Sequence, residues 1–460
     1  MFGESVRRPK GSGLDRSRSA TMGSSLLLPI ASPPANPCIS SLEDSLALHI
    51  LLISQYFYPE QFSNNAIAKN LVARGHDVTS VPCVPNYPDG QFFPGYSNSL
   101  RRREVWEGVE VVRARTVPRR RNKLSLIANY ATYPFAAIRA IAASRGTQAD
   151  VSFVSMPSPL TQAFAGIWAR RKWRIPTVYW VQDLWPETLQ YLFGIKDGAF
   201  LRLLDRVCGW LYRKADIVMV QSPAMIPLVA RHGVPEDRIR VLHNTAAAFY
   251  RPVAAGDHPD IAAQVPNRPF TLMFAGNMGE SQGLEVLVDA MDKLRERNDI
   301  SVAMVGSGRG MEALQARIAA LGLQDRFAFL GRHPEEEMPG FFAQADALFL
   351  SLRDLPNFAL TLPYKIQTYL ACAKPVIASI AGEGARVTRE AGAGLACPPE
   401  DPDALAEAIA TMADMSGDDR TAMGRRGRAY FEKHFAADVI YATLERALSD
   451  AASGKAASRA

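Results

Sequence analysis

The amino-acid sequence predicts an α/β protein of two domains, each built on an open parallel sheet, with an interdomain cleft between the sheets. Short, continuous apolar runs alternate with segments of helical spacing, as in parallel strands that are covered on both faces. The alternation stops at residues 247–267, a Pro- and Ala-rich stretch without a period, and then begins again. A chain of 460 residues is also too long for one ordinary core.

The first domain is expected over residues 48–246. Its opening unit is a strand at Leu48–Ser54, a helix at Asn65–Arg74 that closes at Gly75, and a second strand at Asp77–Val81. The later strands are also short apolar runs, at Val109–Ala114, Val151–Ser155, Thr177–Val181, Ile217–Gln221 and Ile239–Leu242. Because ligands of such sheets bind at the carboxyl ends of the strands, we expect functional residues directly after these runs.

The second domain is expected over residues 268–430, after the linker at 247–267. Its strands are again apolar runs, at Phe270–Ala275, Ser301–Val305, Phe327–Leu330, Ala347–Leu350 and Pro375–Ser379. Helices are expected at Gly283–Arg297 and Met311–Leu321, and from Tyr364 to Ala371. The stretch Asp401–Ser449 has helical spacing, and Pro402 suits a first helical position. Residues 431–460 are interpreted as a C-terminal helix and tail.

Residues 1–47 are predicted to be a disordered extension, because they are rich in Ser, Pro, Gly and Arg and show no sustained period. A short apolar patch, Ser24–Ala31, imitates a secretory signal only weakly, so we expect a dispensable extension and not export. The five cysteines lie far apart, with neither zinc-site nor disulfide spacing, which indicates reduced thiols in a cytoplasmic protein. No apolar run reaches the roughly 18 residues that span a bilayer.

Charge is unevenly distributed along the chain. Residues 1–250 carry 30 Lys and Arg against 18 Asp and Glu, whereas the whole chain has a net charge of only +6. The basic first half is consistent with a surface that faces phosphate or anionic lipid, although a solvated charged surface explains the same composition. No nucleic-acid reader motif accompanies the basic residues, so no nucleic-acid partner is expected.

Several familiar chemistries are not indicated by the sequence. The first strand is not followed by a G-x-G-x-x-G motif, and we find no P-loop, Ser-His-Asp order or metal-ligand spacing. Gly306 and Gly308, in the segment VGSGRG, do lie between a strand and a helix. Backbone N–H groups there could bind a nucleotide, but a tight turn explains the glycines equally well.

The segment VYWVQDLWPE is more informative. A strand ends directly before Gln182 and Asp183, and Trp185 follows. A carboxylate, an amide and an aromatic wall suit sugar hydroxyls, which exchange hydrogen bonds while their C–H faces stack on rings. The alternative is that Asp183 caps the next turn.

A second informative segment, LPYKIQTYLACAKP, starts a helix just after Pro363. Free N–H groups of the first turn and Lys365 are expected to point the same way, which makes a diphosphate site. A lysine in a first helical turn opposes the helix dipole, which suggests that something anionic offsets it. Thr368 lies one turn further and could contact a ribose or remain ordinary helix surface.

Taken in order, these segments resemble the family 4 retaining glycosyltransferases of the GT-B type, which have two Rossmann-like domains. The resemblance covers residues 48–448 and rests on the motifs QYFYPE (55–60), RGHDVT (74–79), VPNYP (84–88), QDLWP (182–186) and FAGNMG (274–279). They are most similar to the branch that builds O-antigen, capsule and colanic-acid-like polysaccharides, including N-acetyl-fucosamine-type transferases.

The resemblance implies an acceptor in the first domain and a nucleotide-diphosphate sugar in the second. It implies catalytic roles for Gln182 and Asp183, near the reacting sugar. The implied donor-binding residues are Gly276, Asn277, Gln282, Gly306, Gly308, Lys365 and Thr368. Residues of the acceptor side or cleft are Tyr58, Glu60, Trp185 and Asn244. Transfer would retain anomeric configuration by front-face attack, with the leaving phosphate helping to take the acceptor proton and with no metal required.

Two departures from the wider family matter. Its paired glutamates correspond here to Leu360 and Thr368, and its phosphate-binding Arg and Lys correspond roughly to Asn277 and Gln282. The branch named above often shares these replacements and keeps a lysine like Lys365. A non-catalytic nucleotide-sugar binder and a nucleotide-sugar 2-epimerase therefore remain as alternatives.

Basic runs at Arg101–Arg103 and Arg119–Arg121 precede the aromatic-interleaved segment Leu124–Ile141. This pattern is typical of peripheral contact with anionic lipid on the inner face of the plasma membrane, and it fits a polyprenyl-diphosphate-linked glycan acceptor. A buried helix beside a solvated loop explains the same residues.

Overall fold

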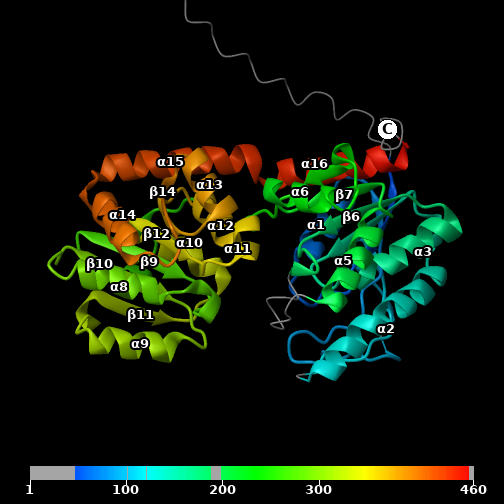
Figure 1. Ribbon diagram of the computed structural model, residues 1–460, viewed down its shortest axis with the longest axis horizontal. Helices are drawn as coiled ribbons and strands as arrows, with labels where there is room; N and C mark the ends of the chain where they lie inside the picture. Colours follow the sequence, from blue (N-terminus) through cyan, green and yellow to red (C-terminus); the bar gives the residue numbers. More distant parts are fainter. Residues whose placement is uncertain (1–46, 101, 121, 188–197, 455–460) are drawn as a thin grey trace, which may run out of the picture. The chain divides into compact units, whose positions relative to one another are not determined.

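The computed structural model describes residues 47–100, 102–120, 122–187 and 198–454. The extension predicted at 1–47 therefore lies outside the described residues except for Ala47, as do Arg101 and Arg121 of the two basic runs. The described chain forms two α/β domains with separate sheets (Figure 1).

The first sheet has eight strands in the order β3-β4-β2-β1-β5-β6-β7-β8. They are β1 (His49–Ile53), β2 (Asp77–Ser80), β3 (Arg103–Trp106), β4 (Val109–Val112), β5 (Val151–Met156), β6 (Thr177–Val181), β7 (Ile217–Val220) and β8 (Ile239–Val241). All neighbours are parallel except β3, which pairs antiparallel with β4. The predicted parallel sheet is thus confirmed, with one antiparallel strand added at its edge. Glu107 and Gly108 both have positive φ, at 49° and 81°, and close a two-residue hairpin between β3 and β4.

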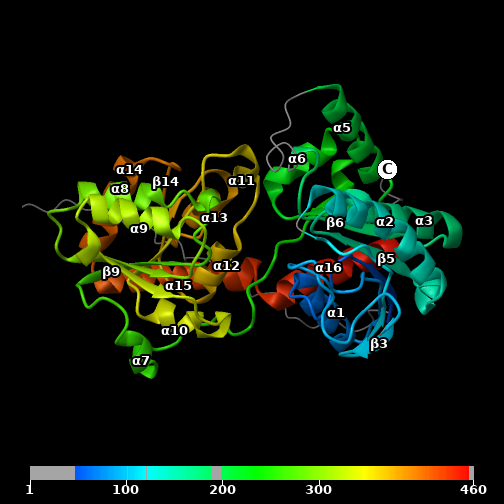
Figure 2. The ribbon, with the colours of Figure 1, turned by 90° about the horizontal axis from the view of Figure 1, so that it is seen from below.

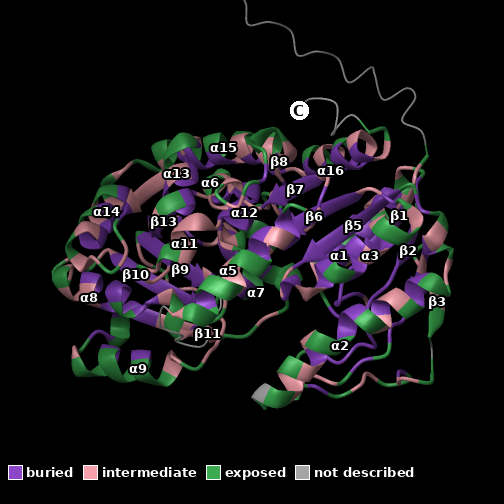
Figure 3. Cartoon of the chain, turned by 45° about the vertical axis from the view of Figure 1, so that its right-hand side comes forward, coloured by how far each residue is buried: buried purple, intermediate pink, exposed green. Residues whose placement is uncertain are grey.

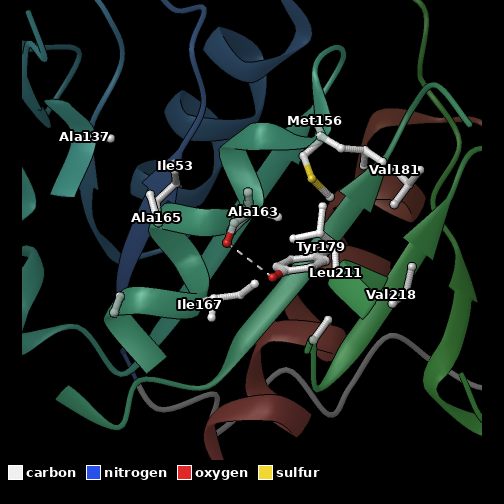
Figure 4. Packing of buried hydrophobic residues seen from close by; sticks show 14 of the residues in the cluster. Ile53, Ala137, Met156, Ala163, Ala165, Ile167, Tyr179, Val181, Leu211 and Val218 are labelled. Atoms are coloured by element: carbon white, nitrogen blue, oxygen red, sulfur yellow. Dashed lines mark hydrogen bonds between the residues drawn. The ribbon is translucent and has the colours of Figure 1, made fainter. Parts of the chain in front are cut away.

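Helices cover both faces of this sheet. One face packs against α2 (Lys123–Ala142), α3 (Ala163–Trp173) and α5 (Ala199–Tyr212), in a core that includes Ala137, Ala163 and Leu211 (Figure 4). The other face packs against α1 (Ser63–Ala73) and α16 (Ala437–Ala452), through residues such as Ile67 and Leu444. The last helix of the chain thus completes the core of the first domain. Because both faces are covered, every residue of β5, β6 and β7 is buried, which accounts for their continuous apolar runs (Figure 3).

The second sheet has six parallel strands in the order β11-β10-β9-β12-β13-β14. They are β9 (Phe270–Ala275), β10 (Ile300–Val305), β11 (Phe327–Gly331), β12 (Ala347–Ser351), β13 (Val376–Ser379) and β14 (Gly394–Cys397). The longer helices around it are α8 (Glu285–Lys293), α9 (Met311–Ala320), α12 (Tyr364–Ala371), α13 (Gly382–Glu390), α14 (Pro402–Asp414) and α15 (Gly417–His434). The shorter helices in this part of the chain are α7 (Pro259–Ala262), α10 (Met338–Ala343) and α11 (Pro356–Leu360). Another short helix, α6 (Ile226–Ala230), belongs to the first domain.

The helical stretch expected at 401–449 is divided into three helices, α14, α15 and α16. Asp401 caps α14 by accepting from the backbone N–H groups of Asp403 and Ala404, and Ser416 caps α15 in the same way. Among the described residues, no helix combines the length and the apolar character that a membrane span requires.

Candidate active site

A pocket of about 450 Å³ lies at the carboxyl ends of β9 and β10. Its walls include four of the residues that the sequence assigned to the donor: Gly276, Asn277, Gly306 and Gly308. Such a position, beyond the strand ends of an open parallel sheet, is where these sheets bind ligands. The pocket is within the size range of small-molecule sites.

The glycines allow two loops to cross in backbone contact. Gly276 and Gly306 have φ of 135° and 124°, and a Cβ at Gly306 would lie 2.0 Å from the carbonyl oxygen of Gly276. A Cβ at Gly308 would lie 2.4 Å from the carbonyl oxygen of Met278, whose N–H donates to the carbonyl of Ser307. The tight-turn explanation for these glycines is therefore correct, and the same turns line the pocket.

Lys365, in the first turn of α12, extends toward the crossing of these loops. Its ammonium donates to Oε1 of Gln282 over 2.7 Å and lies 3.8 Å from the centroid of the Phe274 ring. The φ of 135° at Gly276 favours glycine, and a Cβ there would be 3.1 Å from the lysine Nζ, which would have to shift. The side chain as a whole is half-buried, but its charged end is enclosed by these neighbours, and burial lowers the pKa of Lys365 to about 7.

Among the described residues, no carboxylate pairs with Lys365. Gln282 is neutral and the Phe274 ring offers only a quadrupole, so the lysine holds its proton weakly. The N-terminus of α12 adds to the positive potential, because no side chain caps it after Pro363. An anion at this point would restore the charge on the lysine.

Two other predicted site residues, Thr368 and Asn244, make contacts within the protein. Thr368 is buried and its hydroxyl donates to the carbonyl of Lys365, so it is not the helix surface that one alternative expected. The carbonyl of Asn244 accepts from Nε2 of Gln367 over 2.6 Å, which ties α12 to the segment after β8. Direct ligand contacts by Thr368 and Asn244 stay predictions.

Two arginines that the sequence did not single out also line the pocket. Arg309 precedes α9 and Arg332 follows β11, and neither forms an ion pair with a described residue. They place positive charge near Asn277 and Gln282, where the wider family pattern expects an Arg and a Lys. Arg309 lies inside the VGSGRG segment and could have been noticed from the sequence. Arg332 enters the pocket only because β11 lies next to β10.

Asp183 follows β6 at the carboxyl edge of the first sheet. Its carboxylate makes no hydrogen bond or ion pair with any described residue, so no capping contact is seen within the described part of the chain. Burial raises the pKa of Asp183 to about 6. Gln182 is held beside it, because its Nε2 donates to the Ser155 hydroxyl and its N–H to the carbonyl of Met156.

Three further predicted residues shape the first domain around this edge. Oε1 of Glu60 accepts from the backbone N–H groups of Asn86 and Tyr87, each over 2.7 Å, while its buried Oε2 has no partner among the described residues. The ring of Tyr58 stacks on Trp106 with centroids 4.9 Å apart. Trp185 packs against the core, with a buried and unpartnered Nε1. Packing and loop organisation are thus their visible roles, and contact with an acceptor stays a prediction.

Leu360, which occupies one of the missing glutamate positions, ends the short helix α11. The hydroxyl of Ser222, after β7, donates to its carbonyl, and its side chain packs against the core of the first domain. Leu360 therefore contacts the first domain at a position where the wider family has a glutamate.

Comparison with known proteins identifies both domains. The family described as "Glycosyl transferase 4-like domain" matches residues 63–245, and the family described as "Glycosyl transferases group 1" matches residues 269–415. The two matches include strands β2–β8 of the first sheet and all strands of the second.

Two bacterial proteins that are similar in sequence to this chain are described as glycosyltransferases. The "Probable glycosyltransferase WbjE" of Pseudomonas aeruginosa is 29% identical over 58% of this chain and 65% of its own length. The "Putative colanic acid biosynthesis glycosyl transferase WcaI" of Escherichia coli is 25% identical over 65% of this chain and 74% of its own length. The matched segment thus spans just under two thirds of the first of these relatives.

Among solved structures, Anabaena Alr3699/HepE, crystallised with UDP and glucose, superposes with a TM-score of 0.62. The superposition covers 87% of this chain and 99% of that one at 19% sequence identity, which establishes a shared fold. The chain thus contains a match to the glycosyl transferase 4-like domain followed by a match to the glycosyl transferases group 1 family, on a two-sheet fold that it shares with HepE.

Proposed function

We propose that the protein is a retaining glycosyltransferase that transfers a sugar from a nucleotide diphosphate to a lipid-linked glycan acceptor in cell-surface polysaccharide biosynthesis. The observation that carries the proposal is the enclosed Lys365 ammonium, which has no carboxylate partner and lies beside the glycine-lined pocket. Similarity to WcaI, a putative colanic acid biosynthesis glycosyltransferase, supports the pathway, and similarity to HepE, crystallised with UDP and glucose, supports the class of donor.

In this proposal the donor diphosphate lies between the N-terminus of α12 and the crossing glycine loops. Lys365 becomes fully protonated against it, and Arg309 and Arg332 add to the positive potential of the pocket. Negative charge grows on the diphosphate as the glycosidic bond breaks, so these fixed charges stabilise the transition state more than the ground state. Because the chain supplies this charge itself, we propose that transfer requires no metal.

The acceptor hydroxyl attacks from the face that the diphosphate leaves. The leaving phosphate oxygen takes the hydroxyl proton, and the anomeric configuration is retained. Asp183 and Gln182 orient the reacting sugar by hydrogen bonds from the edge of the first sheet. The unpartnered, half-buried carboxylate of Asp183 is suited to this task because it has no competing donor among the described residues.

A non-catalytic nucleotide-sugar binder is the main alternative, since Leu360 and Thr368 replace the paired glutamates, and a 2-epimerase is a third. Incubation with a panel of nucleotide sugars separates the three. We expect release of nucleoside diphosphate that increases when lipid-linked acceptor is added. A new nucleotide sugar without release would indicate the epimerase, and neither change, despite measurable binding, would indicate the binder.

Asp183→Asn should lower kcat by at least tenfold with little change in donor affinity, because the carboxylate acts on the reacting sugar and not on the diphosphate. If the ionised form is required, wild-type kcat falls as pH drops through about 6, and the variant loses this dependence. Steady-state kinetics over pH 5–8 measure both effects. Asp237→Asn, at an exposed carboxylate outside the site, is the matched control. Wild-type kcat in Asp183→Asn would remove the residue from the mechanism.

Donor affinity should fall as pH rises from 7 to 8.5, approaching tenfold per pH unit. The reason is that free Lys365 loses its proton above a pKa of about 7, whereas the bound diphosphate requires the charged form. Calorimetry of the nucleotide sugar selected by the panel, in two buffers of different ionisation enthalpy, should show uptake of close to one proton at pH 8.5 and none at pH 6. Lys365→Met should bind weakly and without proton uptake. Equal donor affinity of the wild type at pH 7 and pH 8.5 would contradict the proposed diphosphate contact.

We also propose that the first domain binds the surface of an anionic membrane. Helix α2 buries Tyr133 and Ala137 but exposes a stripe of large apolar residues, Leu124, Ile127 and Phe135, of which Leu124 is 79% and Phe135 72% exposed. The buried-helix alternative thus accounts for only one face of α2. Helix α5 covers the same face of the sheet as α2 (Figure 2). It exposes Phe200 and Leu203. Exposed arginines accompany both stripes: Arg120, Arg139, Arg202 and Arg206.

Flotation with vesicles of phosphatidylglycerol and phosphatidylcholine tests this surface. The wild type should float with the vesicles, and L124S/I127S/F135S should lose at least tenfold in the bound fraction, because apolar insertion and charge attraction act together. Val105→Ser removes an equally exposed apolar side chain, 77% exposed on β3, and should float like the wild type. Loss of flotation in that control, or its retention in the triple variant, would contradict the proposed surface.

A further inference from the structure

An arginine enclosed by aromatic rings lies at the carboxyl edge of the first sheet and has no part in the function described so far. The guanidinium of Arg119 lies 5.4 Å from the centroid of the Tyr87 ring and 5.9 Å from that of Tyr130. Its Nη1 donates to the hydroxyl of Tyr56 over 3.4 Å. Phe62 stacks on Tyr56 with centroids 4.7 Å apart and completes the group, which we call the Arg119 cluster.

The charge of Arg119 is not balanced within the described protein. No carboxylate among the described residues forms an ion pair with it, although its side chain is half-buried. Arg113, nearby on the same side of the sheet, is fully buried and is paired with Glu104. Buried charges in proteins are ordinarily paired, and Arg119 has no such partner within the described residues.

The Arg119 cluster is held in place from beneath. Oε1 of Glu60 accepts the N–H groups of Asn86 and Tyr87, and Oδ1 of Asn86 accepts the N–H of Arg119 over 2.8 Å. Gly90, with φ of 69°, lets the same loop pass close to the arginine, since a Cβ there would lie 2.2 Å from the Arg119 carbonyl oxygen. Glu60 is therefore a positioning residue for this cluster, which explains why a carboxylate occurs in that loop.

The cluster lies at the same edge as Asp183. Tyr56 follows β1, Tyr87 follows β2 and Arg119 follows β4, whereas Asp183 follows β6. Only β5 lies between β1 and β6, so two strand spacings, about 10 Å, separate the near side of the cluster from Asp183. One extended ligand can reach both.

We propose that Arg119 binds a phosphate or diphosphate group of the acceptor, with the tyrosine rings packed around that end of the molecule. The inference rests on the proposed transfer and specifies its acceptor: the reacting hydroxyl at Asp183 and the phosphate at Arg119 belong to one short molecule. The acceptor is therefore an early intermediate, with its phosphate near the sugar that reacts. A preceding reaction must place the first sugar on a phosphorylated carrier.

Binding is measured by calorimetry on the full chain carrying Lys365→Ala, which weakens diphosphate binding at the donor pocket. The probes are geranyl diphosphate and inorganic pyrophosphate. We expect adding Arg119→Gln to raise the Kd for geranyl diphosphate at least tenfold, because a charge-assisted contact is lost. Arg115→Gln, at an exposed arginine four residues earlier, should change it less than twofold. Tighter binding of geranyl diphosphate than of pyrophosphate would indicate a lipid contribution, and equal binding would indicate recognition of the anion alone.

Tyr87→Ala is a second variant at a side chain that is 37% exposed, so it tests the cluster even if Arg119→Gln fails to fold. It should weaken both probes severalfold. The proposal is overturned if the Kd is the same with and without Arg119→Gln, if neither protein binds a probe, or if Arg115→Gln causes an equal loss. These experiments measure binding and not turnover. A negative result would therefore contradict the Arg119 site alone, while the panel of nucleotide sugars tests the transferase activity independently.

Discussion

The enclosed charge of Lys365 constrains the second domain more than any other single feature. Its ammonium lies beside Gly276, against the aromatic ring of Phe274 and the uncharged acceptor of Gln282. These neighbours hold the lysine but do not neutralise it, and this is why burial lowers its pKa. A site kept in this state is favourable only when an anion arrives, so binding of the donor is coupled to charging of the lysine.

The same principle distinguishes functional from structural charges elsewhere in the chain. Arg74 pairs with both Asp438 and Glu445, and His76 contacts Glu445, so the polar groups that join the end of α1 to α16 have partners. Arg113 is matched by Glu104. Arg326 and Lys374 also form no ion pair with a described residue, but backbone carbonyls accept their hydrogen bonds. Asp183 and Arg119 at the carboxyl edge of the first sheet, and Lys365 at the start of α12, have neither a charged partner nor such a set of carbonyls among the described residues. A stable core tolerates few such groups, which makes their location informative.

The interpretation of the missing glutamates also changes once the packing is known. Leu360 carries an apolar side chain into the core of the first domain, and Thr368 is buried within α12. A glutamate at position 360 would place a carboxylate against that apolar core. The positive charge of the pocket comes from Arg309 and Arg332 in place of the family's usual residues. The chain thus lacks the paired glutamates and has Arg309 and Arg332 as the basic residues of the pocket.

Much of the fold was determined by local sequence. The limits of β6, β9 and α12 follow directly from apolar runs and from Pro363, because a strand covered on both faces must be continuously apolar and a helix commonly starts after such a proline. The sequence also predicted Asp183 and Lys365 as site residues. Asp183 directly follows a strand and Lys365 lies at the start of a helix, and both kinds of boundary can be recognised from the local sequence. The antiparallel hairpin of β3 was missed because its short strand is half-exposed and carries charge.

What only the tertiary structure decided is which charges remain without partners. Arg113 and Arg119 read alike in the sequence, yet Glu104 pairs with the first while three tyrosine rings surround the second. Arg332 joins the pocket through the adjacency of β10 and β11, and α16 joins a domain that begins almost 400 residues earlier. Burial and pairing depend on neighbours that are distant along the chain, and therefore no local pattern of residues can encode them.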